Sequence, residues 1–87
     1  MNNELLEVKS LLEHRQNLKI DTRGRGKSSF LYVRSSERAS EVSIEGDGFF
    51  VEYWDDANEE SDKAPTKSEI LKSVSEVVES LVEWLRA

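Results

Sequence analysis

Cysteine is absent from this chain of 87 residues, and proline, histidine and methionine occur once each. The lack of cysteine excludes disulfides, thiolate nucleophiles and thiolate metal ligands. No apolar run approaches the length of a membrane-spanning helix, and the amino end lacks the basic and then apolar order of a signal peptide. We therefore expect a cytoplasmic protein with no membrane association.

Charge is plentiful but unevenly distributed. The net charge is -6, and the 37% of apolar residues suffices for one small domain covering residues 1–87. Residues 15–38 contain seven basic and two acidic side chains, whereas residues 41–62 contain nine acidic and no basic ones. Opposite charges on adjacent strands attract each other, and a surface with two signs also orients a partner. Both interpretations remain open.

The amino-terminal segment predicts a helix that begins at Asn2 or Asn3 and runs to about Gln16. Asparagine is a favourable N-cap, and acidic residues follow in the first turn, where they suit the helix dipole. Leu6 lies off the apolar stripe, which comprises Leu5, Val8, Leu11 and Leu12. The single histidine, His14, lies on the polar side with no second ligand or base, so we assign it no role.

Between Asn17 and Trp54 the apolar residues alternate with polar ones, as they do in half-buried strands. The alternating positions are Leu18 and Ile20, Leu31 and Val33, Val42 and Ile44, then Phe49, Val51 and Tyr53. They predict four short antiparallel strands, or three if the first pair forms no strand. A tight hairpin loop joins the last two strands, made either by Asp47 and Gly48 or by Gly46 and Asp47. Both choices keep one face of the hairpin apolar.

The carboxyl-terminal segment predicts an amphipathic helix from Thr66 to Arg86. Thr66 and Glu69 have the spacing of a capping box, in which each side chain bonds the other's backbone amide. The apolar stripe comprises Ile70, Leu71, Val74, Val77, Val78, Leu81, Val82, Trp84 and Leu85. This stripe needs a sheet face to cover it. The predicted class is therefore α+β: a helix, a meander of four or three strands, and a second helix on one sheet face.

Several patterns resemble chemical motifs but lack their essential parts. Gly26-Lys27-Ser28 ends like a P-loop, yet Asp21 occupies the position of its first glycine and a strand follows instead of a helix. The acidic stretch Asp56–Asp62 alternates like a calcium loop, but it lacks the central glycine, and Lys67 occupies the closing position. No nucleophile and base can be paired from the sequence. We therefore expect no enzyme activity, cofactor or metal.

The residues between the aliphatic strand positions are unusually rich in aromatics. If the aliphatic residues face the helices, an outward face is formed by Phe30, Tyr32, Arg34, Phe50, Glu52 and Trp54. Aromatic residues and arginine anchor many protein interfaces. Three alternatives would remove this surface: helices on opposite faces of the sheet, one mispaired strand, or Phe30 and Tyr32 in the core.

A second candidate is the basic loop formed by Arg23, Arg25 and Lys27 with two intervening glycines. Three cations next to exposed aromatics suit single-stranded nucleic acid, where the cations bind phosphates and the rings stack on bases. The overall acidity of the chain opposes a polyanion.

The sequence therefore favours a small acidic soluble module that binds another protein, or itself as a homodimer, through an exposed aromatic sheet face. Single-stranded nucleic-acid binding through Arg23 to Lys27 is the alternative. The helix–sheet–helix order is common among small bacterial interaction proteins, including inhibitors and immunity proteins, which is an analogy of fold alone.

Overall fold

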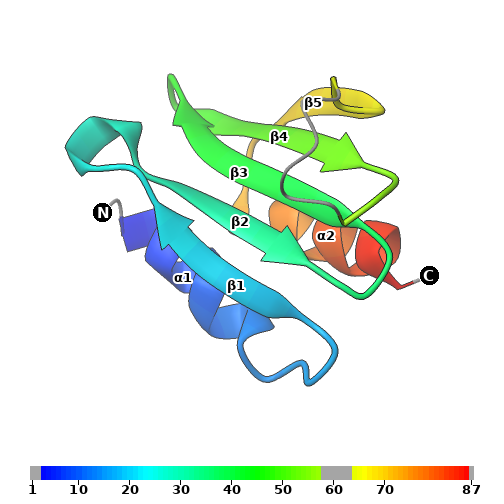
Figure 1. The fold of residues 1–87 in the computed structure, drawn as a ribbon. Helices are drawn as coiled ribbons and strands as arrows, with labels where there is room; N and C mark the ends of the chain where they lie inside the picture. Colours follow the sequence, from blue (N-terminus) through cyan, green and yellow to red (C-terminus); the bar gives the residue numbers. More distant parts are fainter. Residues whose placement is uncertain (1–2, 58–63, 87) are drawn as a thin grey trace.

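The computed structural model describes residues 3–57 and 64–86 (Figure 1). Its elements, in chain order, are α1 (Asn3–Leu12), β1 (Lys19–Arg23), the 3-10 turn η1 (Gly26–Ser28), β2 (Phe30–Arg34), β3 (Ala39–Glu45), β4 (Gly48–Trp54), β5 (Lys67–Leu71) and α2 (Val74–Leu85). Among the described helices, none is long and apolar enough to cross a membrane.

The strands form one antiparallel meander in the order β1-β2-β3-β4-β5. Each strand pairs with the next along the chain, as short connections favour. The α+β class is therefore as predicted, and the segment containing Leu18 and Ile20 does contribute a strand at Ile20. The described residues form five strands rather than four, because the chain adds β5 beside β4 before the second helix begins.

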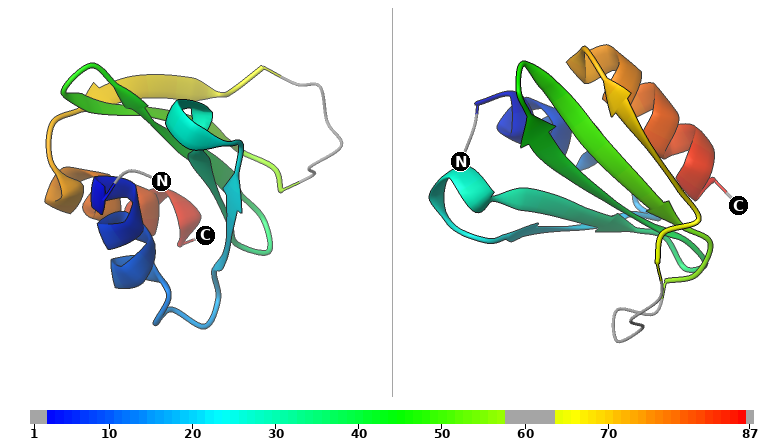
Figure 2. Two further views of the ribbon diagram at one scale, coloured as in Figure 1. Left: turned by 90° about the vertical axis from the view of Figure 1, so that its left-hand side faces the viewer. Right: turned by 90° about the horizontal axis from the view of Figure 1, so that it is seen from above.

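Both helices lie on the same face of the sheet, which we call the inner face (Figures 1 and 2). The alternation of β2, β3 and β4 sends one apolar set of side chains toward the helices. The fully buried core comprises Leu5, Val8, Leu12, Leu31, Val33, Val42, Phe49, Val51, Tyr53, Val77, Leu81 and Leu85. The helices also contact each other, so together they cover one face, and neither described α-helix lies on the opposite one.

The first helix is shorter than predicted and ends at Leu12. Residues 13–17 contain no apolar side chain, so no buried contact supports a further turn. Instead, Arg15 N–H donates to the carbonyl of Leu12 at 3.1 Å, and the chain turns toward β1. The predicted stripe was wrong at Leu11, which is 50% exposed, whereas Leu6 lies off the stripe as predicted and is 46% exposed.

The hairpin between β3 and β4 uses the second of the two predicted loops. Glu45 is paired with Gly48, so Gly46 and Asp47 form the loop. Gly46 has φ +60° and Asp47 has a negative φ, as a type II′ turn requires.

The capping box expected at Thr66 and Glu69 was wrong. Thr66 N–H donates to the carbonyl of Tyr53 at 2.7 Å, and the following residues form β5. The helix is capped seven residues later, where the Ser73 hydroxyl accepts from Glu76 N–H at 3.2 Å and the Glu76 carboxylate accepts from Lys72 N–H at 2.9 Å. The sequence therefore contains the box twice, and backbone pairing with β4 prevents the first copy from starting a helix.

Trp84 anchors the end of α2 to the sheet. Its indole N–H is shared between the carbonyls of Ala39 at 3.2 Å and Trp54 at 3.0 Å. The centre of its ring lies 5.3 Å from the centre of the Tyr53 ring, and the two rings pack edge to face. Arg38 lies over the indole at 4.6 Å and donates to the Trp84 carbonyl at 3.1 Å, which satisfies a helix-end carbonyl.

The corrected cap gives a direct test. We expect Ser73→Ala to lower the free energy of unfolding by about 1 kcal/mol, because the N-cap hydrogen bond is lost. Ser75→Ala is the matched control, since Ser75 is exposed inside the helix, and it should leave stability unchanged or slightly raised. Urea denaturation followed by circular dichroism measures both. Equal effects of the two changes would contradict the assignment of Ser73 as the cap.

Candidate functional site

The face opposite the helices, which we call the outer face, carries its side chains in three rows across the strands. The apolar row comprises Phe30, Ser43, Phe50 and Ile70 and ends at Arg23 on β1; the acidic row comprises Asp21, Tyr32, Glu41, Glu52 and Ser68; the basic row comprises Lys19, Arg34, Ala39 and Trp54. The structure thus places all six predicted face residues on one surface, and the alternatives that put the helices on opposite faces or Phe30 and Tyr32 in the inner core do not hold.

The apolar row is partly open to solvent. Phe30 and Phe50 are half-buried, and Ile70 is 48% exposed at the β5 edge. Ile70 lies directly opposite Phe50, so the two side chains form one apolar surface. The sequence analysis missed Ile70 because it assigned this residue to the helix stripe.

Tyr32 differs from the other aromatics of this face because it is only 5% exposed. The Arg23 guanidinium lies 4.3 Å from the centre of its ring, and Asp21 holds the same guanidinium at 3.4 Å. This cation–π contact covers Tyr32 from the β1 side. Tyr32 therefore contributes to the packing of the outer face and offers little surface to a partner.

Two glutamates occupy directly opposite positions in the acidic row. Glu41 on β3 is paired with Glu52 on β4, and like charges in such a pair repel each other. Burial raises the pKa of Glu41 above its ordinary value of 4.5, the Glu52 charge raises it further, and Arg23 partly opposes both effects. Among the described residues, no ion pair neutralises either carboxylate.

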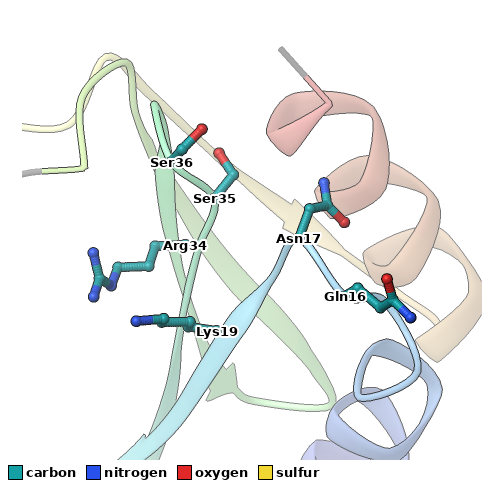
Figure 3. Close-up of a pocket in the computed structure, with 6 residues that line it drawn as sticks. All are labelled: Gln16, Asn17, Lys19, Arg34, Ser35 and Ser36. Atoms are coloured by element: carbon teal, nitrogen blue, oxygen red, sulfur yellow. The ribbon is translucent and has the colours of Figure 1, made fainter.

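The cations of the basic row also face each other, since Lys19 and Arg34 are cross-strand partners. They border a shallow pocket of about 280 Å³ with Gln16, Asn17, Ser35 and Ser36. Figure 3 shows that Lys19 and Arg34 project together to one side, whereas Gln16 and Asn17 lie on the other side toward the helices. The lining groups therefore do not converge on a common point where a ligand could sit.

Two cations of the predicted basic loop, Arg23 and Arg25, have different surroundings. Arg23 ends β1 and lies against Tyr32, whereas Arg25 is exposed in the loop beyond it. The backbone of Lys27 lies in η1, and its side chain is outside what the structure describes. Phosphate contacts by Arg23 would therefore have to compete with its stacking on Tyr32.

A partly buried polar cluster lies on the inner face, where the sequence predicted only core. The Tyr53 hydroxyl donates to the Glu69 carboxylate at 2.6 Å and also bonds the Ser80 hydroxyl, which itself donates to Glu69 at 3.2 Å. Burial and the bond to Glu69 raise the pKa of Tyr53. The Lys67 ammonium lies 4.8 Å from the centre of the Tyr53 ring. The cluster joins β4, β5 and α2. Tyr53 has no exposed surface, whereas Ser80 is half-buried and lines a pocket of about 320 Å³ with Arg38, Lys67, Glu83 and Trp84.

The described residues contain no group of three acidic or histidine side chains placed to hold a metal ion. The calcium-like stretch falls partly outside this description, since residues 58–62 are not described.

Comparison with protein families, with curated proteins and with solved structures finds no match to this chain.

The repulsion between Glu41 and Glu52 makes stability depend on pH in a defined direction. Because the pKa of Glu41 is raised in the folded state, the folded protein holds more protons than the unfolded chain just above pH 4.5, and stability falls as pH rises through this window. We expect Glu41→Gln to raise the free energy of unfolding by about 0.5 kcal/mol at pH 7. The gain should disappear below pH 4.5.

Glu79→Gln is the control, since Glu79 is exposed on α2, and it should show no such dependence. Urea denaturation at several pH values measures the free energy of unfolding of the unsubstituted chain and of both variants. Loss of stability in Glu41→Gln at pH 7 would show that this carboxylate is compensated in the folded state.

Proposed function

We propose that this chain is a cytoplasmic protein-binding module whose contact surface is the outer face. The observation that carries the proposal is the apolar row, in which Ile70 is exposed and Phe30 and Phe50 stay partly accessible although two described helices pack on the sheet. Both helices are used on the inner face, so an apolar surface on the other side stays in water unless a partner covers it. Side chains of this kind anchor protein interfaces.

Single-stranded nucleic acid is the less well supported partner. The acidic row crosses the same face as the aromatics that would stack on bases, and carboxylates repel the phosphate backbone. Arg23 is also engaged with Tyr32 and Asp21, which leaves the exposed Arg25 as the described cation of the loop best placed to meet a phosphate.

Site-specific photocrosslinking in the native cells tests the proposal. We expect p-benzoylphenylalanine in place of Phe50 to form a discrete adduct, because this position lies in the proposed contact surface. The same residue in place of Leu11, which is 50% exposed on α1, is the matched control and should form none. An adduct of twice the 10.0 kDa chain mass identifies a second copy, and any other discrete mass identifies a different protein.

A second substitution shows whether the adduct depends on the outer face. Ile70→Ser should abolish the adduct from position 50, whereas Leu6→Ser, a comparably exposed change on α1, should leave it intact. Absence of an adduct from position 50, or equal adducts from positions 50 and 11, would contradict the proposed function.

A further inference from the structure

The outer face is divided by charge along the sheet. Its β3, β4 and β5 part combines half-buried Phe50 and exposed Ile70 with the opposed carboxylates of Glu41 and Glu52, and we call these four residues the acidic patch. The sequences of β3 and β4 contain no lysine or arginine. Neither strand therefore offers a cation to Glu41 or Glu52.

The single cation of β5 does not reach this patch. Lys67 lies over the rings of Tyr53 and Trp84, at 4.8 Å and 5.4 Å from their centres, and both contacts are on the inner face or its edge. Lys72, just beyond β5, pairs with Asp47 at the hairpin loop. Both cations nearest the patch along β5 are thus held elsewhere.

Keeping Glu41 opposite Glu52 is unfavourable for the isolated fold, since like charges face each other on a half-buried surface. A lysine or arginine placed between the two carboxylates would remove this repulsion. The apolar stem of the same side chain would lie along Phe50, the next outward residue of β4. A basic partner with apolar neighbours is therefore complementary to the patch in both charge and polarity.

We propose that the acidic patch binds a basic amphipathic helix of a partner protein, an inference that rests on the function proposed above. A lysine or arginine of this helix would lie between Glu41 and Glu52, and an apolar side chain would pack on Phe50 and Ile70. The spacing supports a helix: outward rows two residues apart on a strand are separated by about 6.7 Å. Side chains three or four residues apart on a helix are about 5–6 Å apart. One helix face can therefore place an apolar group and a cation on neighbouring rows.

Two synthetic amphipathic peptides test this pairing. They share their leucine positions and differ only in carrying lysine or glutamate at the flanking positions. In NMR titrations at about 0.15 M salt, where long-range attraction is screened, we expect the lysine peptide to shift the amide signals of the acidic patch. The glutamate peptide should shift none of them.

Matched double variants separate specific binding from general attraction to an acidic protein. Glu41→Gln with Glu52→Gln should weaken the lysine peptide at least about tenfold. Glu79→Gln with Glu83→Gln removes the same charge from exposed positions of α2 and should weaken it less than about twofold.

Three outcomes would overturn the inference. If both peptides bind the outer face equally, charge does not select the partner, although the proposed function stands. If both double variants weaken the lysine peptide equally, binding is general attraction to acidic residues. If neither peptide shifts the patch, the patch does not bind such a helix, and crosslinking at position 50 decides separately whether the outer face binds proteins at all.

Discussion

The arrangement of two helices side by side on one sheet face is the constraint on which the rest of the structure depends. Strand alternation gives the central strands one largely apolar face, represented by Leu31, Val42 and Val51, and the buried stripes of α1 and α2 meet there. Burial of this apolar surface is the dominant favourable term in a domain of this size. Trp84 fixes the position of α2 through two backbone carbonyls, and Tyr53 supports it from the sheet.

The outer face follows from the same constraint. Because the helices share the inner face, the alternate strand positions are left to solvent or to a partner, and these positions carry apolar, acidic and basic rows. Two features of this face are unfavourable for the chain alone: the partly accessible apolar surface of Phe50 and Ile70, and the opposition of Glu41 and Glu52. A basic amphipathic partner would compensate both, which is why we attribute function to this face and not to the helices.

The strands were predictable from sequence because alternation is a local property, and it placed Phe50 and Trp54 on the correct face. The end of α1 and the nature of β5 were not predictable in this way. Ile70 and Leu71 continue the helical stripe of α2 in sequence, and Thr66 begins a capping box, but pairing with the edge of β4 decides their structure. For the same reason Ile70 was absent from the predicted face. The stacking of Arg23 that buries Tyr32 is also a tertiary contact with no sequence pattern to predict it.

The neighbouring residues Phe49 and Phe50 allow the most direct test of this account, since one ring is buried under the helices and the other lies on the outer face. A soluble gadolinium chelate relaxes the ring protons that it can approach. Measured in a dilute solution where the chain is monomeric, this relaxation compares the solvent accessibility of the two rings within one molecule. The account requires strong relaxation of Phe50 and protection of Phe49. Equal protection of both rings would contradict it, because the outer face would then be covered by the chain itself.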